Sequence, residues 1–153
     1  MTQSKVLLGV GGGIAAFKAA ALASQLAQRG HAVRVAMTSA ATEFVGALTF
    51  EGLTGQKVLL SSTQIDPDGS VPHIAATRDA DVFVVAPATA DVMARLAAGF
   101  CDDPVALAAV ACECPRLLCP AMNDAMWRNR IVQRNVALLA ESGVAAVVQQ
   151  SLV

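Results

Sequence analysis

Short apolar runs alternate along the chain with segments in which apolar residues recur at helical spacing. Strands are predicted by the apolar runs at 5–10, 31–37, 81–86, 117–118 and 144–148. Helices are predicted by the intervening segments at 14–29, 40–55, 71–79, 105–113 and 129–142, and a further helix is predicted to open at the turn 87–91 and to run through Ala98. Strands that alternate with helices in this way predict an α/β fold, a doubly wound parallel sheet in a single domain over 1–153.

The same pattern makes local predictions. Segment 40–55 is expected to form two short helices with a break near Gly46 or Thr49, and its two phenylalanines, Phe44 and Phe50, are expected in the core. The polar stretch 61–70 contains a Pro-Asp-Gly turn signal and predicts a surface loop. The first helix carries its larger apolar residues on one face, namely Ile14, Phe17, Ala21, Leu22 and Leu26.

Composition adds a prediction about assembly. Hydrophobic residues make up 55% of the 153 residues and charged residues only 15%, and the mean hydropathy is +0.54. No apolar run approaches the ~18 residues of a membrane span, and the N-terminus does not resemble a signal peptide. The apolar excess therefore predicts subunit contacts, a homo-oligomer, in the cytoplasm and without a membrane partner.

Charge and cysteine content narrow the function classes. The net charge of −1 and a pI of about 6.0, with no basic stripe, argue against nucleic acid as a partner. Cys112 and Cys114 have C-x-C spacing, which differs from the C-x-x-C of common zinc sites. No metal is expected, and the cysteines are interpreted as reduced, small hydrophobic residues.

The first strand leads into a glycine-rich turn. Residues 11–16, Gly-Gly-Gly-Ile-Ala-Ala, fit the G-x-G-x-x-A pattern in which glycines let the backbone approach a phosphate at a helix N-terminus. The pattern for NAD also requires an acid at the end of the second strand, where this sequence has Met37-Thr38-Ser39-Ala40. The turn therefore favours a mononucleotide such as FMN over NAD.

Two further turns and one histidine are candidates for chemistry. A turn of small residues at 87–91 contains Thr89 and opens a helix, and the stretch 119–127 places Asn123 among two methionines and the tryptophan. An amide in an apolar pocket can bind a carboxylate, but Asn123 can equally be a simple cap with Met and Trp in the core. His73 follows a proline at the start of a helix, where a structural role is also open.

These motifs together identify a family resemblance. The segments 11–18, 73–74, 86–91 and 120–127, the last of the form P-x-M-N-x-x-M-W, occur in an order similar to that of the homo-oligomeric flavin-containing cysteine decarboxylases. That family includes phosphopantothenoylcysteine decarboxylase and peptidyl-cysteine decarboxylases. The resemblance implies a flavodoxin-like (Rossmann-like) fold and a homotrimer or dodecamer with FMN at subunit contacts.

The resemblance also implies residue roles. His73 would be the catalytic base, and Asn123 with Met126 would bind the substrate. The FMN would be lined by Gly12, Gly13, Ile14, Thr38, Thr89, Ala90, Asp91 and Ala121. Oxidation of the cysteinyl thiolate by the flavin would place a C=S electron sink β to the carboxylate, so that CO₂ can leave and an enethiol remains.

The substrate is left open by the sequence. Relatives that act in coenzyme A synthesis continue past the last strand into a flap with an Ala-Cys-Gly motif, and none of Cys101, Cys112, Cys114 and Cys119 takes that place. This difference favours oxidative decarboxylation of a C-terminal cysteine on a peptide. The alternatives are phosphopantothenoylcysteine as substrate, or a flavin-binding regulatory subunit without turnover.

Overall fold

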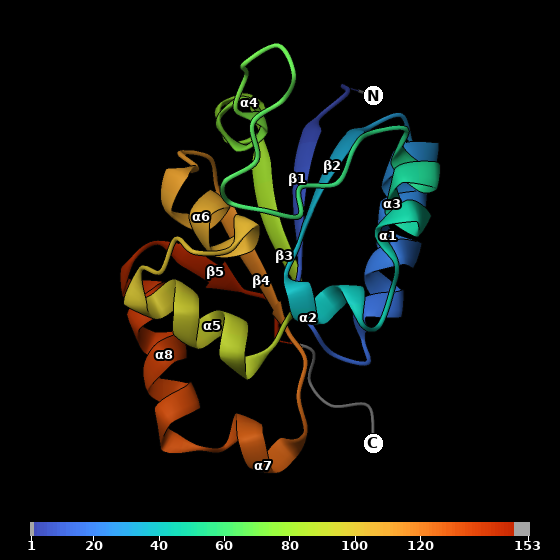
Figure 1. Ribbon diagram of the computed structural model, residues 1–153. Helices are drawn as coiled ribbons and strands as arrows, with labels where there is room; N and C mark the ends of the chain where they lie inside the picture. The colour runs from blue at the N-terminus through green and yellow to red at the C-terminus, as the bar shows by residue number, and fades with distance from the viewer. Residues whose placement is uncertain (1, 149–153) are drawn as a thin grey trace.

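A five-stranded parallel sheet runs through the computed structural model, which describes residues 2–148 (Figure 1). The strand order is β2-β1-β3-β4-β5, so the chain adds β2 on one side of β1 and then β3, β4 and β5 on the other. This order is that of the flavodoxin-like fold, and it confirms the predicted fold class. The strands are β1 Lys5–Val10, β2 Ala32–Met37, β3 Val82–Ala88, β4 Arg116–Pro120 and β5 Val144–Ala146.

Helices cover both faces of the sheet, as a doubly wound fold requires (Figure 1). One face carries α1 Ala16–Gln28 and α3 Ala47–Thr54, and the other carries α5 Ala90–Ala98, α6 Pro104–Ala111 and α8 Arg130–Glu141. Three further helices lie near the ends of the strands: α2 Ser39–Thr42, α4 Pro72–Asp79 and α7 Asp124–Trp127. The predicted break in 40–55 is confirmed, whereas α7 was not predicted as a separate helix.

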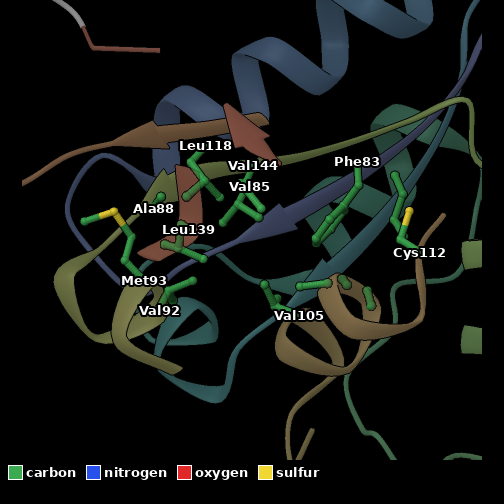
Figure 2. Packing of buried hydrophobic residues seen from close by; sticks show 14 of the residues in the cluster. Phe83, Val85, Ala88, Val92, Met93, Val105, Cys112, Leu118, Leu139 and Val144 are labelled. Atoms are coloured by element: carbon green, nitrogen blue, oxygen red, sulfur yellow. The ribbon is translucent and has the colours of Figure 1, made fainter. Parts of the chain in front are cut away.

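The two faces of the sheet have separate apolar cores. Figure 2 shows the cluster beneath α5, α6 and α8, where Phe83 and Val85 of the central strand pack against Val105 of α6. The second cluster contains Leu8 and Phe50 and lies under α1 and α3. Because both faces of β1 and β3 are covered, their residues are apolar at nearly every position.

Several details differ from the predictions. Phe50 is fully buried as expected, but the prediction for Phe44 is wrong, since its side chain is 53% exposed. The first helix buries small residues, Ala16, Ala19 and Ala23, because it lies close to the sheet. Its larger residues do not share one buried environment: Leu22 and Leu26 pack against the core, whereas Ile14 and Phe17 are exposed.

Close backbone packing shapes the glycine turn after β1. The Gly11 N–H donates to the Pro87 carbonyl at the end of β3 at 3.1 Å, and a Cβ on Gly11 would lie 2.4 Å from that oxygen. A Cβ on Gly12 would lie 2.3 Å from the Ala40 Cβ and 2.7 Å from the Ala40 carbonyl carbon. Glycine is therefore required at both positions so that the turns after β1, β2 and β3 can meet.

Gly12→Ala should lower the free energy of unfolding by about 1–3 kcal/mol, because the added methyl group cannot be placed without moving the α2 backbone. Gly13→Ala is the matched control, since its Cβ would make an ordinary 3.4 Å contact with Thr89 Cγ2. Urea unfolding of the flavin-free proteins measures both. Equal stability of the two variants would contradict the close packing at Gly12.

Candidate functional site

The turns that follow β1, β2 and β3 enclose a cleft of about 470 Å³ at the carboxyl edge of the sheet. In a sheet of this order, β1 and β3 are the strands at which the chain changes direction, and ligands bind outside their carboxyl ends. The cleft is lined by Gly12, Thr38, Ser39, Ala40, Thr89, Asp91, Val92, Arg95, Asp102 and Asp103. Its position and size are those of a small-molecule site.

Backbone N–H groups on the wall of this cleft, at Gly12 and Asp91, and on the residues next to them are free to bind an anion. Within the described residues, the N–H groups of Gly12, Gly13 and Ile14 donate to no protein acceptor. Ala90 and Asp91 form the first turn of α5, where N–H groups have no partner within the helix. The Thr89 hydroxyl caps α5 by accepting from Val92 N at 3.2 Å. The arrangement suits a phosphate at a glycine turn and a helix N-terminus.

Thr38 caps the helix that follows β2, just as Thr89 caps the helix that follows β3. Its side-chain oxygen accepts from Ala41 N at 3.1 Å and caps α2, and its own N–H donates to the Val10 carbonyl at 3.2 Å. Thr38 and Thr89 therefore fix the two turns that face the glycine turn. The sequence indicated both turns, and the structure brings them together.

Of the charged residues on the wall of the cleft, Asp91 was predicted as a site residue, whereas Arg95, Asp102 and Asp103 were not. Arg95 Nε donates to Asp103 Oδ2 at 3.1 Å, and Arg95 Nη2 pairs with Asp102. The Asp103 carboxylate also caps α6, because its Oδ1 accepts from Val105 N and Ala106 N, each at 2.9 Å. In the sequence, this aspartate lies just before the helix predicted at 105–113, and no local pattern placed Arg95 beside it.

The loop after β4 lies next to the end of β3. Ala121 N donates to the Ala88 carbonyl at 3.2 Å, which places the loop near Thr89. Asn123 is exposed and caps α7, with its Oδ1 accepting from Met126 N at 2.9 Å. The cap holds the amide with its oxygen toward the helix, so that the Nδ2 group remains free to donate outward.

Capping and chemistry are thus compatible at Asn123. Met122 and Trp127 pack against the core beneath α5, α6 and α8, as the purely structural interpretation of this stretch requires. Met126, by contrast, is 43% exposed. The stretch anchors itself through two apolar side chains and presents an amide and a thioether at the surface.

His73 does not join these residues within one protomer. It lies in the first turn of α4, and α4 packs near the amino ends of β1 and β2, where Ala75 and Asp79 share a cleft with Lys5 and Ala32. Figure 1 shows α4 and α7 at opposite ends of the sheet. The His73 Nδ1 atom is buried and has no hydrogen-bond partner in the described part of the chain.

Two cysteines on either side of β4, Cys114 before the strand and Cys119 near its end, are neutral thiols. Burial raises the pKa of the Cys119 thiol, just before the Asn123 loop. Burial, with a hydrogen bond to Cys112, raises the pKa of Cys114 from its usual 9.0 to about 12. Both thiols stay protonated at neutral pH.

Between residues 2 and 148, no three His, Cys, Asp or Glu side chains gather in a way that could hold a metal ion, and no helix is long and apolar enough to cross a bilayer.

Comparison with known proteins supports a single family. The model of the Flavoprotein family matches residues 1–153. The coenzyme A biosynthesis bifunctional protein CoaBC of Vibrio vulnificus (strain YJ016) is 43% identical over 146 residues, which cover 94% of this chain and 36% of that protein. CoaBC of Mycobacterium tuberculosis (strain CDC 1551 / Oshkosh) is 43% identical over 143 residues, covering 94% and 34%. The chain spans about a third of the length of these relatives.

Solved structures share the fold. The FMN-dependent cysteine decarboxylase TvaF from thioviridamide biosynthesis has a TM-score of 0.87 at 30% identity, covering 95% of this chain and 90% of that one. The FMN-dependent cysteine decarboxylase SpaF has a TM-score of 0.87 at 34% identity, covering 95% and 83%. The predicted family is thereby confirmed: the chain belongs to the Flavoprotein family and is related within it to FMN-dependent cysteine decarboxylases.

Proposed function

We propose that this chain binds FMN at the carboxyl edge of the sheet and decarboxylates a substrate that ends in a cysteinyl carboxylate. The observation that carries the proposal is the meeting of three phosphate-compatible turns in one cleft, with the exposed amide of Asn123 on the adjoining loop. Family membership and the decarboxylase structures point to the same chemistry.

The residues present fit an FMN. Gly12, with no room for a Cβ, and Gly13 and Ile14, with free N–H groups, would hold the phosphate together with Thr38 and the Thr89–Asp91 turn. The Ile14 side chain is 82% exposed at the rim of this turn and offers an apolar surface to a flat ring. Ala90 and Ala121 complete the small-residue wall between the cleft and Asn123.

The bound flavin supplies the two-electron oxidation of the substrate thiolate. The chain's own residues bind and orient the substrate. Asn123 Nδ2 donates to the substrate carboxylate without adding a charge, because Asn123 Oδ1 is already committed to Met126 N. Met126 packs against the substrate from the same turn of α7. His73 takes the thiol proton at its imidazole, the side chain that most often serves as a general base in enzymes.

Phosphopantothenoylcysteine is the substrate that we propose first. The curated relatives at 43% identity are bifunctional proteins of coenzyme A biosynthesis. A solved phosphopantothenoylcysteine decarboxylase variant complexed with pantothenoylaminoethenethiol has a TM-score of 0.84 at 28% identity, covering 95% of this chain and 82% of that one. The sequence-based preference for a peptide depended on where the sequence ends. It carries no weight in a chain that spans a third of its relatives.

A peptide with a C-terminal cysteine remains the second candidate, because TvaF acts in the biosynthesis of thioviridamide. Incubation of the FMN-loaded protein with 4′-phosphopantothenoylcysteine and, separately, with a cysteine-ended peptide distinguishes the two. Mass spectrometry should show loss of CO₂, with or without two hydrogens, from the phosphopantothenoyl substrate. Turnover of the peptide alone would reverse the order, and turnover of neither would refute the proposed activity.

Substitutions at Asn123 separate its structural role as the cap of α7 from its proposed role as a hydrogen-bond donor to the substrate. Asn123→Asp retains an oxygen that can cap α7 but replaces the donor with a negative charge, so that binding of a carboxylate is opposed. Asn123→Ala loses both cap and donor and should lower kcat/KM by about 100-fold. The aspartate variant should be at least as inactive while remaining folded and yellow with FMN. An active Asn123→Asp variant, or a colourless one, would contradict the assigned role.

The distance between α4 and α7 implies that the complete site needs two protomers. If His73 and Asn123 act on one substrate, His73 must come from a neighbouring copy, since the two residues lie at opposite ends of the sheet within one chain (Figure 1). The surface is suited to such contacts. Its large exposed apolar side chains include Ile14, Phe17, Phe44, Leu48, Ile74 and Phe100. A homo-oligomer, either a trimer or a dodecamer built from four trimers, follows as part of the proposal.

Mixing two inactive variants tests this arrangement. His73→Asn and Asn123→Asp should each be inactive alone. Co-expressed in equal amounts, they should recover roughly a quarter of wild-type activity, since random assembly places both native residues at that share of two-protomer sites. Separately purified variants mixed without exchange of subunits are the control. No recovery in verified mixed oligomers would contradict a site shared between protomers.

A further inference from the structure

Among the residues that the structure describes, Arg95 is the one cation on the wall of a cleft that also carries three carboxylates, those of Asp91, Asp102 and Asp103. Its side chain is 27% exposed, and its guanidinium is held by Asp102 and Asp103 from the segment that follows α5. The Phe100 ring lies beneath it, with 5.0 Å between the guanidinium carbon and the ring centroid. Arg95 is therefore fixed in place on three sides.

This charge pattern conflicts with the phosphate that the backbone of the same cleft is built to receive. A phosphate monoester carries about −1.5 to −2 charges at pH 7, and nearby carboxylates oppose its binding. Free N–H groups supply partial positive charge, yet they are neutral overall. The carboxylates therefore need a partner if an anion is to enter.

We propose that Arg95 determines the specificity of the site for the phosphate group of the cofactor. This inference rests on the FMN site proposed above. By pairing with Asp102 and Asp103, Arg95 offsets one of their two negative charges and so favours binding of FMN over the uncharged riboflavin. Arg95 acts here through the two aspartates, and no contact between its guanidinium and the phosphate is required.

Two features indicate that Arg95 compensates the charge of the aspartates and does not merely hold the two segments together. The hydrogen bond from Arg95 holds the pKa of the Asp102 carboxyl below its usual range, so that this group is fully ionised at neutral pH. Asp103 already has a structural task as the cap of α6, which its Oδ1 performs without Arg95. The cap on α6 thus holds the segment before this helix without Arg95. The main contribution of the guanidinium is therefore its positive charge.

The test measures dissociation constants of FMN and riboflavin by quenching of flavin fluorescence on addition to flavin-free protein. Arg95→Gln should raise the FMN constant roughly tenfold at low salt and leave that for riboflavin within about twofold. Asp102→Asn should change the FMN constant in the opposite direction, because it removes a negative charge from the wall. Arg95→Lys, which retains the charge, should resemble the wild type.

Salt and a matched surface arginine complete the design. The effect of Arg95→Gln on FMN should shrink as ionic strength rises, since screening weakens the interaction. Arg29→Gln is the control: it makes the same change in net charge at an exposed residue just after α1, at the end of that helix away from the glycine turn. It should leave both dissociation constants unchanged.

The outcomes separate the inference from the proposed function. If Arg95→Gln and Asp102→Asn both weaken FMN, or if Arg95→Gln weakens riboflavin as much as FMN, then the ion pair is structural and the inference is overturned while the FMN site stands. A wild-type protein that binds neither flavin would refute the proposed cofactor itself.

Discussion

The hydrogen bond from Gly11 N to the Pro87 carbonyl joins the ends of β1 and β3, and the candidate site depends on it. These two strands are where the chain changes its direction of growth across the sheet, so their carboxyl ends leave a gap that no crossover helix fills. Gly11 lets the two backbones approach within hydrogen-bonding distance, and Gly12 lets the same turn pack against α2. The free N–H groups of the turn are consequently held at one edge, facing Thr38 and Thr89.

The Asn123 loop extends this edge with a second kind of recognition. The cleft offers backbone N–H groups to an anion, whereas Asn123 offers a neutral amide whose direction is set by its cap on α7. Because Asn123 Oδ1 is used to cap the helix, Asn123 Nδ2 remains available to a ligand. Such a division allows the residue to be both structural and functional, and it explains why two interpretations of the stretch could coexist.

Two features of the protomer bear on the oligomer proposed above. Ile14 and Leu48 are more than three-quarters exposed. His73 lies with α4 near the amino ends of the strands, and its buried Nδ1 has no hydrogen-bond partner among residues 2–148. In the proposed homo-oligomer, association of protomers covers the apolar side chains and brings His73 to a neighbour's Asn123. The hydrophobic surplus in the composition would then serve the proposed site as well as assembly.

The sequence by itself determined the elements and the turns. Alternation of apolar runs with helical spacing predicted the parallel sheet, and the glycine turn, the Thr89 turn and the Asn123 stretch were each visible as local patterns. Local patterns suffice here because strand burial, helix caps and close backbone approach depend on a few neighbouring residues. The exposure of Phe44 was not visible in this way, because Phe44 lies in the turn between α2 and α3, outside both helices, and only the fold shows which way that turn faces.

Only the tertiary structure decided which of these turns meet and which charges join them. Arg95, Asp102 and Asp103 come together because α5 and the segment before α6 converge on the cleft, and no residue spacing shows that convergence. The family resemblance grouped His73 with Asn123, yet within one protomer the fold places α4 and α7, where these residues lie, at opposite ends of the sheet. Distances between residues far apart in sequence are set by the packing of whole elements, and the sequence specifies that packing only through the sum of many weak contacts.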